Sequence, residues 1–170
     1  MTEVPLDLAE LRAVTAYAVA CAEPALAIFA SARPADDRPR AAIEAARAFA
    51  QGAKRSKTIR DGAWAAQRAY QEARDAGEAA AGEAARAAVA ACGAAFLHPL
   101  AKASQVLHIL GPAGHAAYAF ELAGAAYPVD ARAVADPVVR RVLARYPNAP
   151  SGRGRMGELV RELDAALRRP

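Results

Sequence analysis

Apolar residues recur every three or four positions along most of the chain, the spacing that places them on one face of an α-helix. The pattern is clearest at the C-terminal end, at Met156, Leu159, Val160, Leu163, Ala166 and Leu167. The same spacing predicts further helices at about residues 11–28, 38–51, 58–76, 78–97, 101–110, 113–123 and 137–146. The chain is therefore predicted to be all-α, a compact Ala-rich bundle of about seven to eight helices.

Proline and glycine mark the predicted ends of these helices. Pro24 interrupts the first apolar stripe, so this helix either kinks or splits there. Gly111 and Pro112 predict a break between two short helices. Asp37 precedes a proline in the first turn of the next helix, where its carboxylate is expected to accept a free backbone amide.

Composition also favours helices over strands. Alanine, the best helix former, supplies 51 of the 170 residues, and aromatic residues make up only 6%. Strand-forming residues are too sparse for a β-sandwich or a doubly wound sheet. The length fits a single domain over residues 1–170, and 55% hydrophobic residues are enough for its core.

The expected compartment is the cytoplasm. Cys21 and Cys92 lie in Ala-rich helical stretches without metal-ligand spacing, and we expect two buried thiols. The N-terminus lacks the basic region of a signal peptide, and the most apolar run, 87–97, is too short to span a bilayer. We therefore expect a soluble protein without a membrane partner.

Three segments together resemble a known family. They are residues 32–47, with Arg-Pro-Ala-Asp-Asp-Arg-Pro-Arg; residues 108–121, which begin His-Ile-Leu-Gly-Pro; and residues 143–159, with Arg-Tyr-Pro and Gly-Arg-Gly-Arg-Met-Gly. In this order they resemble the Imm5-like immunity proteins, small all-helical bacterial proteins of polymorphic toxin systems. The resemblance spans about residues 10–168. It implies a non-enzymatic protein that binds a cognate toxin and blocks it.

One aromatic residue falls outside the apolar stripe of its helix. Trp64 lies opposite that stripe, with Arg60 four positions before it and Arg68 four positions after it. Either the helix is buried on two sides and Trp64 fills a second contact, or Trp64 is exposed. In the second case these three residues are candidates for partner binding, because Trp and Arg most often anchor interfaces.

The positive charge is concentrated near the C-terminus. Residues 131–170 hold nine arginines and four acidic residues, a net charge of +5, whereas residues 1–130 carry −1. Arg153 and Arg155 precede the last helix, where free amides favour an anion. They are either solvated or candidates for binding an acidic partner or a phosphate. The alternative function is therefore a helical nucleic-acid or phosphate-ligand binder, although no nucleic-acid-binding motif supports the former.

The remaining polar candidates do not form a recognisable catalytic motif. His98 and His108 each end a predicted helix and are expected to cap carbonyls, but they would converge with Glu121 if their helices fold back. Asp36 and Asp37 are adjacent carboxylates, one of them an expected helix cap. No metal, cofactor or catalytic residue is predicted, and a homodimer stays an open alternative.

Overall fold

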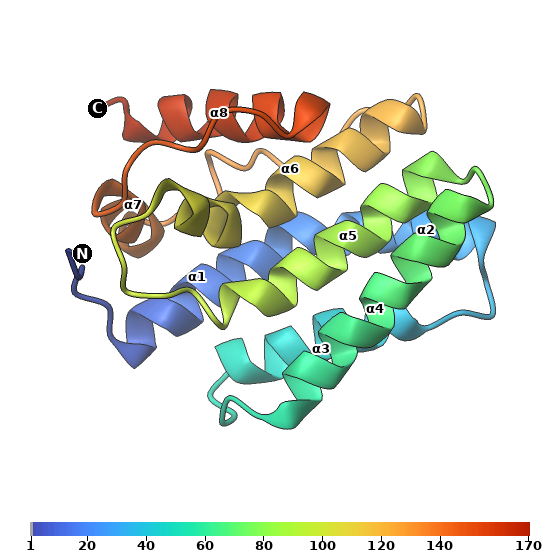
Figure 1. Ribbon diagram of the computed structural model, residues 1–170, viewed down its shortest axis with the longest axis horizontal. Helices are drawn as coiled ribbons and strands as arrows, with labels where there is room; N and C mark the ends of the chain where they lie inside the picture. The colour runs from blue at the N-terminus through green and yellow to red at the C-terminus, as the bar shows by residue number, and fades with distance from the viewer. Residues whose placement is uncertain (1) are drawn as a thin grey trace.

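The computed structural model describes residues 2–170 and shows helices joined by loops (Figure 1). The α-helices are α1 (Leu8–Ala22), α2 (Leu26–Ala32), α3 (Arg38–Ala50), α4 (Lys57–Asp75), α5 (Ala79–Ala94), α6 (Val106–Leu122), α7 (Pro137–Ala144) and α8 (Gly154–Arg168), with 3₁₀ turns at Glu23–Ala25 and Ala103–Gln105. Within residues 2–170 the β-type pairing is limited to one isolated bridge, between Glu3 and Leu100. The predicted all-α fold is confirmed.

Helix α5 lies at the centre of the bundle. It packs against α4 on one side and α6 on the other, and α8 packs on α6 (Figure 1). Helix α1 crosses behind this layer and contacts α3, α5, α6 and α7. Helices α4 and α8 therefore lie on opposite sides of the α5–α6 pair (Figure 1).

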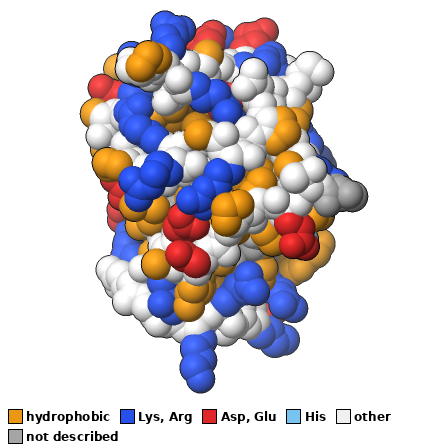
Figure 2. Space-filling view, turned by 90° about the vertical axis from the view of Figure 1, so that its left-hand side faces the viewer, with side chains coloured by type: hydrophobic (Ala, Val, Ile, Leu, Met, Phe, Trp, Pro, Cys, Tyr) orange, Lys and Arg blue, Asp and Glu red, His pale blue; other side chains and the backbone are white. Residues whose placement is uncertain are grey.

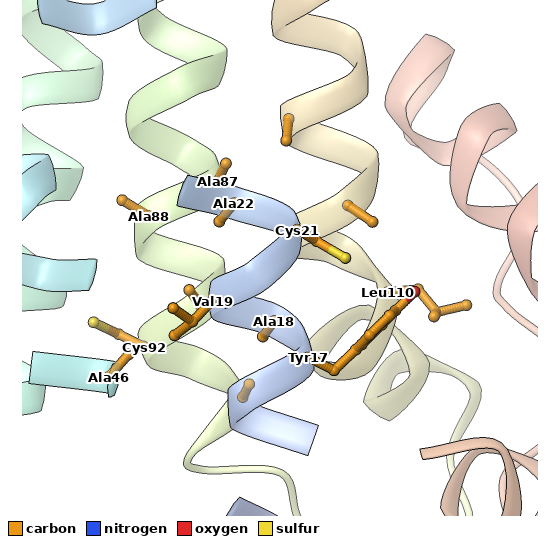
Figure 3. Packing of buried hydrophobic residues seen from close by; sticks show 14 of the residues in the cluster. Tyr17, Ala18, Val19, Cys21, Ala22, Ala46, Ala87, Ala88, Cys92 and Leu110 are labelled. Carbon is orange, nitrogen blue, oxygen red and sulfur yellow. The ribbon is translucent and has the colours of Figure 1, made fainter. Parts of the chain in front are cut away.

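Alanine allows the central helices to approach one another closely. Ala18 and Ala22 of α1 lie beside α5, where Ala87 and Ala88 are also fully buried (Figure 3). Tyr17 points from α1 toward the α6 side of this core, and its hydroxyl donates a hydrogen bond to the Ala131 carbonyl. Small side chains on facing helices shorten the distance between helix axes, which explains how an Ala-rich chain fills its core.

Both cysteines are buried, as predicted. Burial raises the pKa of the Cys21 thiol to about 11 and that of the Cys92 thiol to about 12. The Cys92 thiol donates a hydrogen bond to the Ala42 carbonyl at 3.2 Å. Both side chains are therefore protonated at neutral pH and act as small core residues.

Of the two alternatives for Pro24, a kink or a split, the structure shows a split, whereas the prediction for Pro112 fails. Pro24 lies in the 3₁₀ turn Glu23–Ala25, which joins α1 to α2 without a loop. Pro112 lies inside α6, which runs without a break, so the predicted break at Gly111 and Pro112 is wrong. The missing amide of Pro112 removes one helical hydrogen bond, but both residues are buried among neighbouring helices, and that packing keeps the helix continuous.

Acidic residues cap two of the helices. Asp7 and Glu10 form a reciprocal capping box at the start of α1, and the Asp136 carboxylate accepts the Val139 amide at the start of α7. Asp37 precedes α3, but its carboxylate makes no capping hydrogen bond. The expected cap at Asp37 is therefore wrong.

Among residues 2–170, the helical stretch Leu8–Ala32 is long and apolar enough, by length and composition, to span a membrane. Its most apolar 18-residue window has a mean hydropathy of 1.6, and 56% of that window is buried inside the fold. The expectation that no apolar run reaches that length is corrected, because the turn at Pro24 leaves α1 and α2 continuous. The core position of α1 accounts for its apolar composition.

Candidate functional site

Helix α4 is buried on one side only. Its inward positions are Ile59, Ala66, Ala69 and Ala73. Trp64 lies on the other side with 67% of its surface exposed, and Arg60 and Arg68 are exposed one turn before and after it. The structure thus decides between the two alternatives for Trp64 in favour of exposure. We call Arg60, Trp64 and Arg68 the α4 face.

The two arginines of the α4 face differ in their contacts. The Arg60 guanidinium lies 5.5 Å from the centre of the Phe96 ring, which Arg55 also contacts at 5.3 Å. Arg68 makes no hydrogen bond or ion pair with residues 2–170. The face therefore presents one arginine held on an aromatic ring, one arginine without a partner and an exposed indole.

Arg153 and Arg155 lie at the start of α8, which the α5–α6 pair separates from α4 (Figure 1). Arg155 pairs with Glu121 at 2.5 Å and with Glu158 at 3.1 Å. The hydrogen bonds from Arg155 lower the pKa of the Glu121 carboxyl. Arg153 has a left-handed backbone, with φ of 63°, and no ion pair with any described residue. The structure does not bring the five predicted partner-binding residues together.

Most of the C-terminal arginines stabilise the fold itself. The side chains of Arg140, Arg145, Arg155, Arg161 and Arg168 all donate hydrogen bonds to backbone carbonyls or to carboxylates. Arg161, for example, donates to the carbonyls of Pro150 and Gly152 and so holds the loop before α8. Most of the arginines that make this region positively charged therefore hold loops and helices in place through hydrogen bonds.

Some of this charge is still visible at the surface. The end of the bundle that carries both termini and α7 shows more Lys and Arg than Asp and Glu side chains (Figure 2). Hydrophobic side chains are scattered between the charged ones on this face. An arrangement of this kind favours acidic surfaces in an encounter, but it does not by itself define a site.

The adjacent carboxylates Asp36 and Asp37 do not form a paired acidic site. Asp36 accepts hydrogen bonds from the backbone amide and guanidinium of Arg38, which lower the pKa of its carboxyl. Arg38 also pairs with Glu72 of α4. This cluster fastens the start of α3 to α4, which is a structural role.

The two predicted histidine caps are not formed. His98 lies in the loop after α5, where its backbone amide donates to the Gln105 side chain. His108 lies in the first turn of α6, so it cannot cap that helix's C-terminal carbonyls. Glu121 is thirteen positions further along the same helix, about 20 Å away, and pairs with Arg155. The alternative arrangement, in which these side chains converge, does not occur.

His108 instead lines a cleft with a volume of about 330 Å³ between α5, α6 and the start of α8. Arg86, His115 and Arg153 also line this cleft. His115 was in no predicted set, and its partner Glu83 is 32 positions away in the sequence, too far for a local motif to reveal the pair. Burial lowers the pKa of His108 and so favours its neutral form.

No group of three or more His, Cys, Asp or Glu side chains is arranged to hold a metal ion within the described part of the chain. Neither the curated proteins nor the solved structures include a significant match to this sequence. A family model does match, over residues 5–149, and its description is Imm-5 like putative immunity protein. Because the match covers most of the 170 residues, the chain belongs to this Imm-5 like immunity-protein family.

Proposed function

We propose that the protein is a cytoplasmic, non-enzymatic immunity protein that binds a cognate toxin protein through the α4 face and blocks it. Family membership supports the class of partner. The observation that supports the surface is Trp64, which stays exposed on a helix whose opposite side is fully packed. No contact within residues 2–170 requires a tryptophan there.

The chemistry of the α4 face suits a partner with acidic and apolar groups. Burying the indole removes a large apolar surface from water, and a guanidinium beside it can pair with a carboxylate of the partner. Arg60 is already held against Phe96, so it loses little side-chain freedom on binding. Arg68 brings an unpaired charge that speeds encounter with an acidic surface.

The test begins with capture from nuclease-treated lysate of the source organism at moderate salt, with the tagged full chain as bait. We expect one stoichiometric protein that is retained by the wild type and lost by the double variant Trp64→Ala, Arg68→Ala. That protein, expressed alone, is expected to arrest growth, and co-expression of the wild-type chain to restore it. A captured protein without toxicity contradicts the proposal.

A control variant separates the α4 face from the rest of the surface. Arg40→Ala removes one exposed charge from α3 and is expected to leave capture and growth rescue unchanged. Equal retention of the captured protein by the double variant would contradict the assignment of the surface. Nucleic acid retained in place of protein, when nuclease is omitted, would favour the alternative function.

A further inference from the structure

The cleft between α5, α6 and the start of α8 has the lining of an anion site. Its polar residues are Arg86, Ser104, Gln105, His108, His115 and Arg153. No Asp or Glu among residues 2–170 lines it. The two guanidinium groups in the lining outnumber the one carboxylate beside it, that of Glu83 next to His115, so the cleft is positively charged at neutral pH.

Both arginines of the cleft lack an acidic partner within the part of the chain that the structure describes. Arg86 is held by its contact with the Tyr70 ring, whose centre lies 4.9 Å from the guanidinium carbon. Arg153 directly precedes α8 and has a left-handed backbone conformation. Elsewhere in the fold, arginines such as Arg38 and Arg145 are paired with carboxylates. The cleft thus holds two guanidinium groups that can bind an external anion.

His115 adds a fixed polar group. It is only 7% exposed, and its Nδ1 lies 2.6 Å from the Glu83 carboxylate. Its Nε2 makes no hydrogen bond with residues 2–170. Because His115 lines the cleft, an imidazole nitrogen with no partner inside the fold is a polar group that a bound ligand can contact.

The other walls are apolar, and small residues provide the space. Val89, Leu107 and Met156 line the cleft together with Ala90, Gly93 and Gly111. A Cβ atom at Gly93 would lie 3.2 Å from Nδ1 of His108, so a larger residue there would move the imidazole. The cleft therefore combines cationic groups with an apolar wall, as sites for small organic anions do.

We propose that this cleft binds a small organic phosphate, with the phosphate group between Arg86 and Arg153 and the organic group against Val89, Leu107 and Met156. Guanidinium groups match the geometry of phosphate oxygens and bind them by paired hydrogen bonds. The volume of about 330 Å³ suits one small ring rather than a polymer. Arg60, Trp64 and Arg68 of the α4 face do not line the cleft, so the inference does not rest on the proposed function.

The experiment is a titration of the isotope-labelled full chain with phenyl phosphate, inorganic phosphate and benzoate, followed by NMR at constant ionic strength. We expect saturable shifts at Gly93, Gly111 and the two cleft histidines. Phenyl phosphate is expected to bind about tenfold more tightly than inorganic phosphate, because it also buries a ring. Absence of saturable shifts with either phosphate would overturn the site. Equal affinity for the two phosphates, or for benzoate and phenyl phosphate, would overturn the ligand class.

Two variants and one control test the arginines. Arg153→Gly removes the guanidinium and suits the local φ of 63°, so the fold is retained. Arg86→Lys keeps a positive charge but loses the planar fork. Each is expected to weaken phenyl phosphate binding about tenfold, with Arg40→Ala unchanged. Wild-type affinity in Arg153→Gly would refute the assignment even if Arg86→Lys fails to fold. Capture of the toxin by Arg153→Gly is expected to remain intact, which separates this site from the α4 face.

Discussion

The imidazole Nδ1 of His115 lies 2.6 Å from a carboxylate oxygen of Glu83 and so joins α6 to α5 beside the cleft. The pair is set within an Ala-rich contact that otherwise offers few polar groups. His115 is buried and Glu83 is partly buried, so removing the carboxylate leaves the buried imidazole without a partner, which costs more than the hydrogen bond contributes.

Replacing Glu83 should therefore destabilise the fold. Glu83→Ala leaves the His115 imidazole unpaired and is expected to lower the free energy of unfolding by about 1–3 kcal/mol. Glu83→Gln retains an acceptor oxygen and should lose less. Urea unfolding at pH 7 measures both values, and equal losses in the two variants would contradict a hydrogen-bonded pair.

Two glycines of α6 should respond oppositely to the same substitution. A Cβ at Gly114 would lie 2.6 Å from Cγ2 of Val160, so Gly114→Ala is expected to cost about 1–3 kcal/mol through overpacking against α8. A Cβ at Gly111 would approach nothing closer than the Ala90 Cβ at 3.9 Å. Gly111→Ala should therefore stabilise the helix by up to about 1 kcal/mol. Thermal unfolding that ranks the two variants in the reverse order would contradict the packing described here.

The ion pair between Glu10 and Arg145 predicts a loss of stability in acid. The hydrogen bonds from Arg145 lower the pKa of Glu10 below its ordinary value of 4.5. The pair's contribution is therefore fully present above pH 4.5 and is lost as the pH falls through the lowered pKa. Glu10→Gln keeps an oxygen for the Asp7 amide but lacks this pH dependence.

Urea unfolding of wild type and Glu10→Gln across this pH range measures how the contribution of the ion pair to stability changes with pH. The variant is expected to be about 1 kcal/mol less stable at pH 7, with the difference shrinking below pH 4.5. Glu3→Gln changes an exposed carboxylate and serves as the control. A difference that grows in acid would contradict the pairing.

The periodicity of the sequence was sufficient to predict most of the helices, but not to predict where one helix ends and the next begins. The last helix was recognisable from Met156 to Leu167 because apolar residues recur along it every three or four positions. The continuity of α6 through Pro112 was not, because burial against other helices outweighs the loss of one backbone hydrogen bond. Helix propensity describes a residue in its own segment and does not include packing against other helices.

For the site residues too, the sequence predicted part of the arrangement and the structure was needed for the rest. Periodicity placed Trp64 off the buried stripe, but only the arrangement of α4 beside α5 shows that most of the residue stays exposed. Arg153 and Arg155 looked equivalent in the sequence. They differ in the structure because Glu121, at the end of α6, reaches only Arg155. The cleft combines residues from three helices, and no short motif encodes such a set.

Trp64 should contribute little to the stability of the free protein. Because the side chain is 67% exposed, Trp64→Ala is expected to change the free energy of unfolding by less than about 0.5 kcal/mol. Phe49→Ala, at a buried aromatic of α3, should cost about 3–5 kcal/mol. Urea unfolding of both variants tests the contrast, and a large loss in Trp64→Ala would show that the indole supports the fold.

The most direct test of the α4 face is the affinity of the captured toxin for purified variants, measured by isothermal titration calorimetry. We predict that Trp64→Ala weakens binding at least about 30-fold, the effect of losing one anchor residue. Leu122→Ala, at an exposed apolar residue of α6, should stay within about twofold of wild type. Wild-type affinity in a folded Trp64→Ala variant would contradict the account.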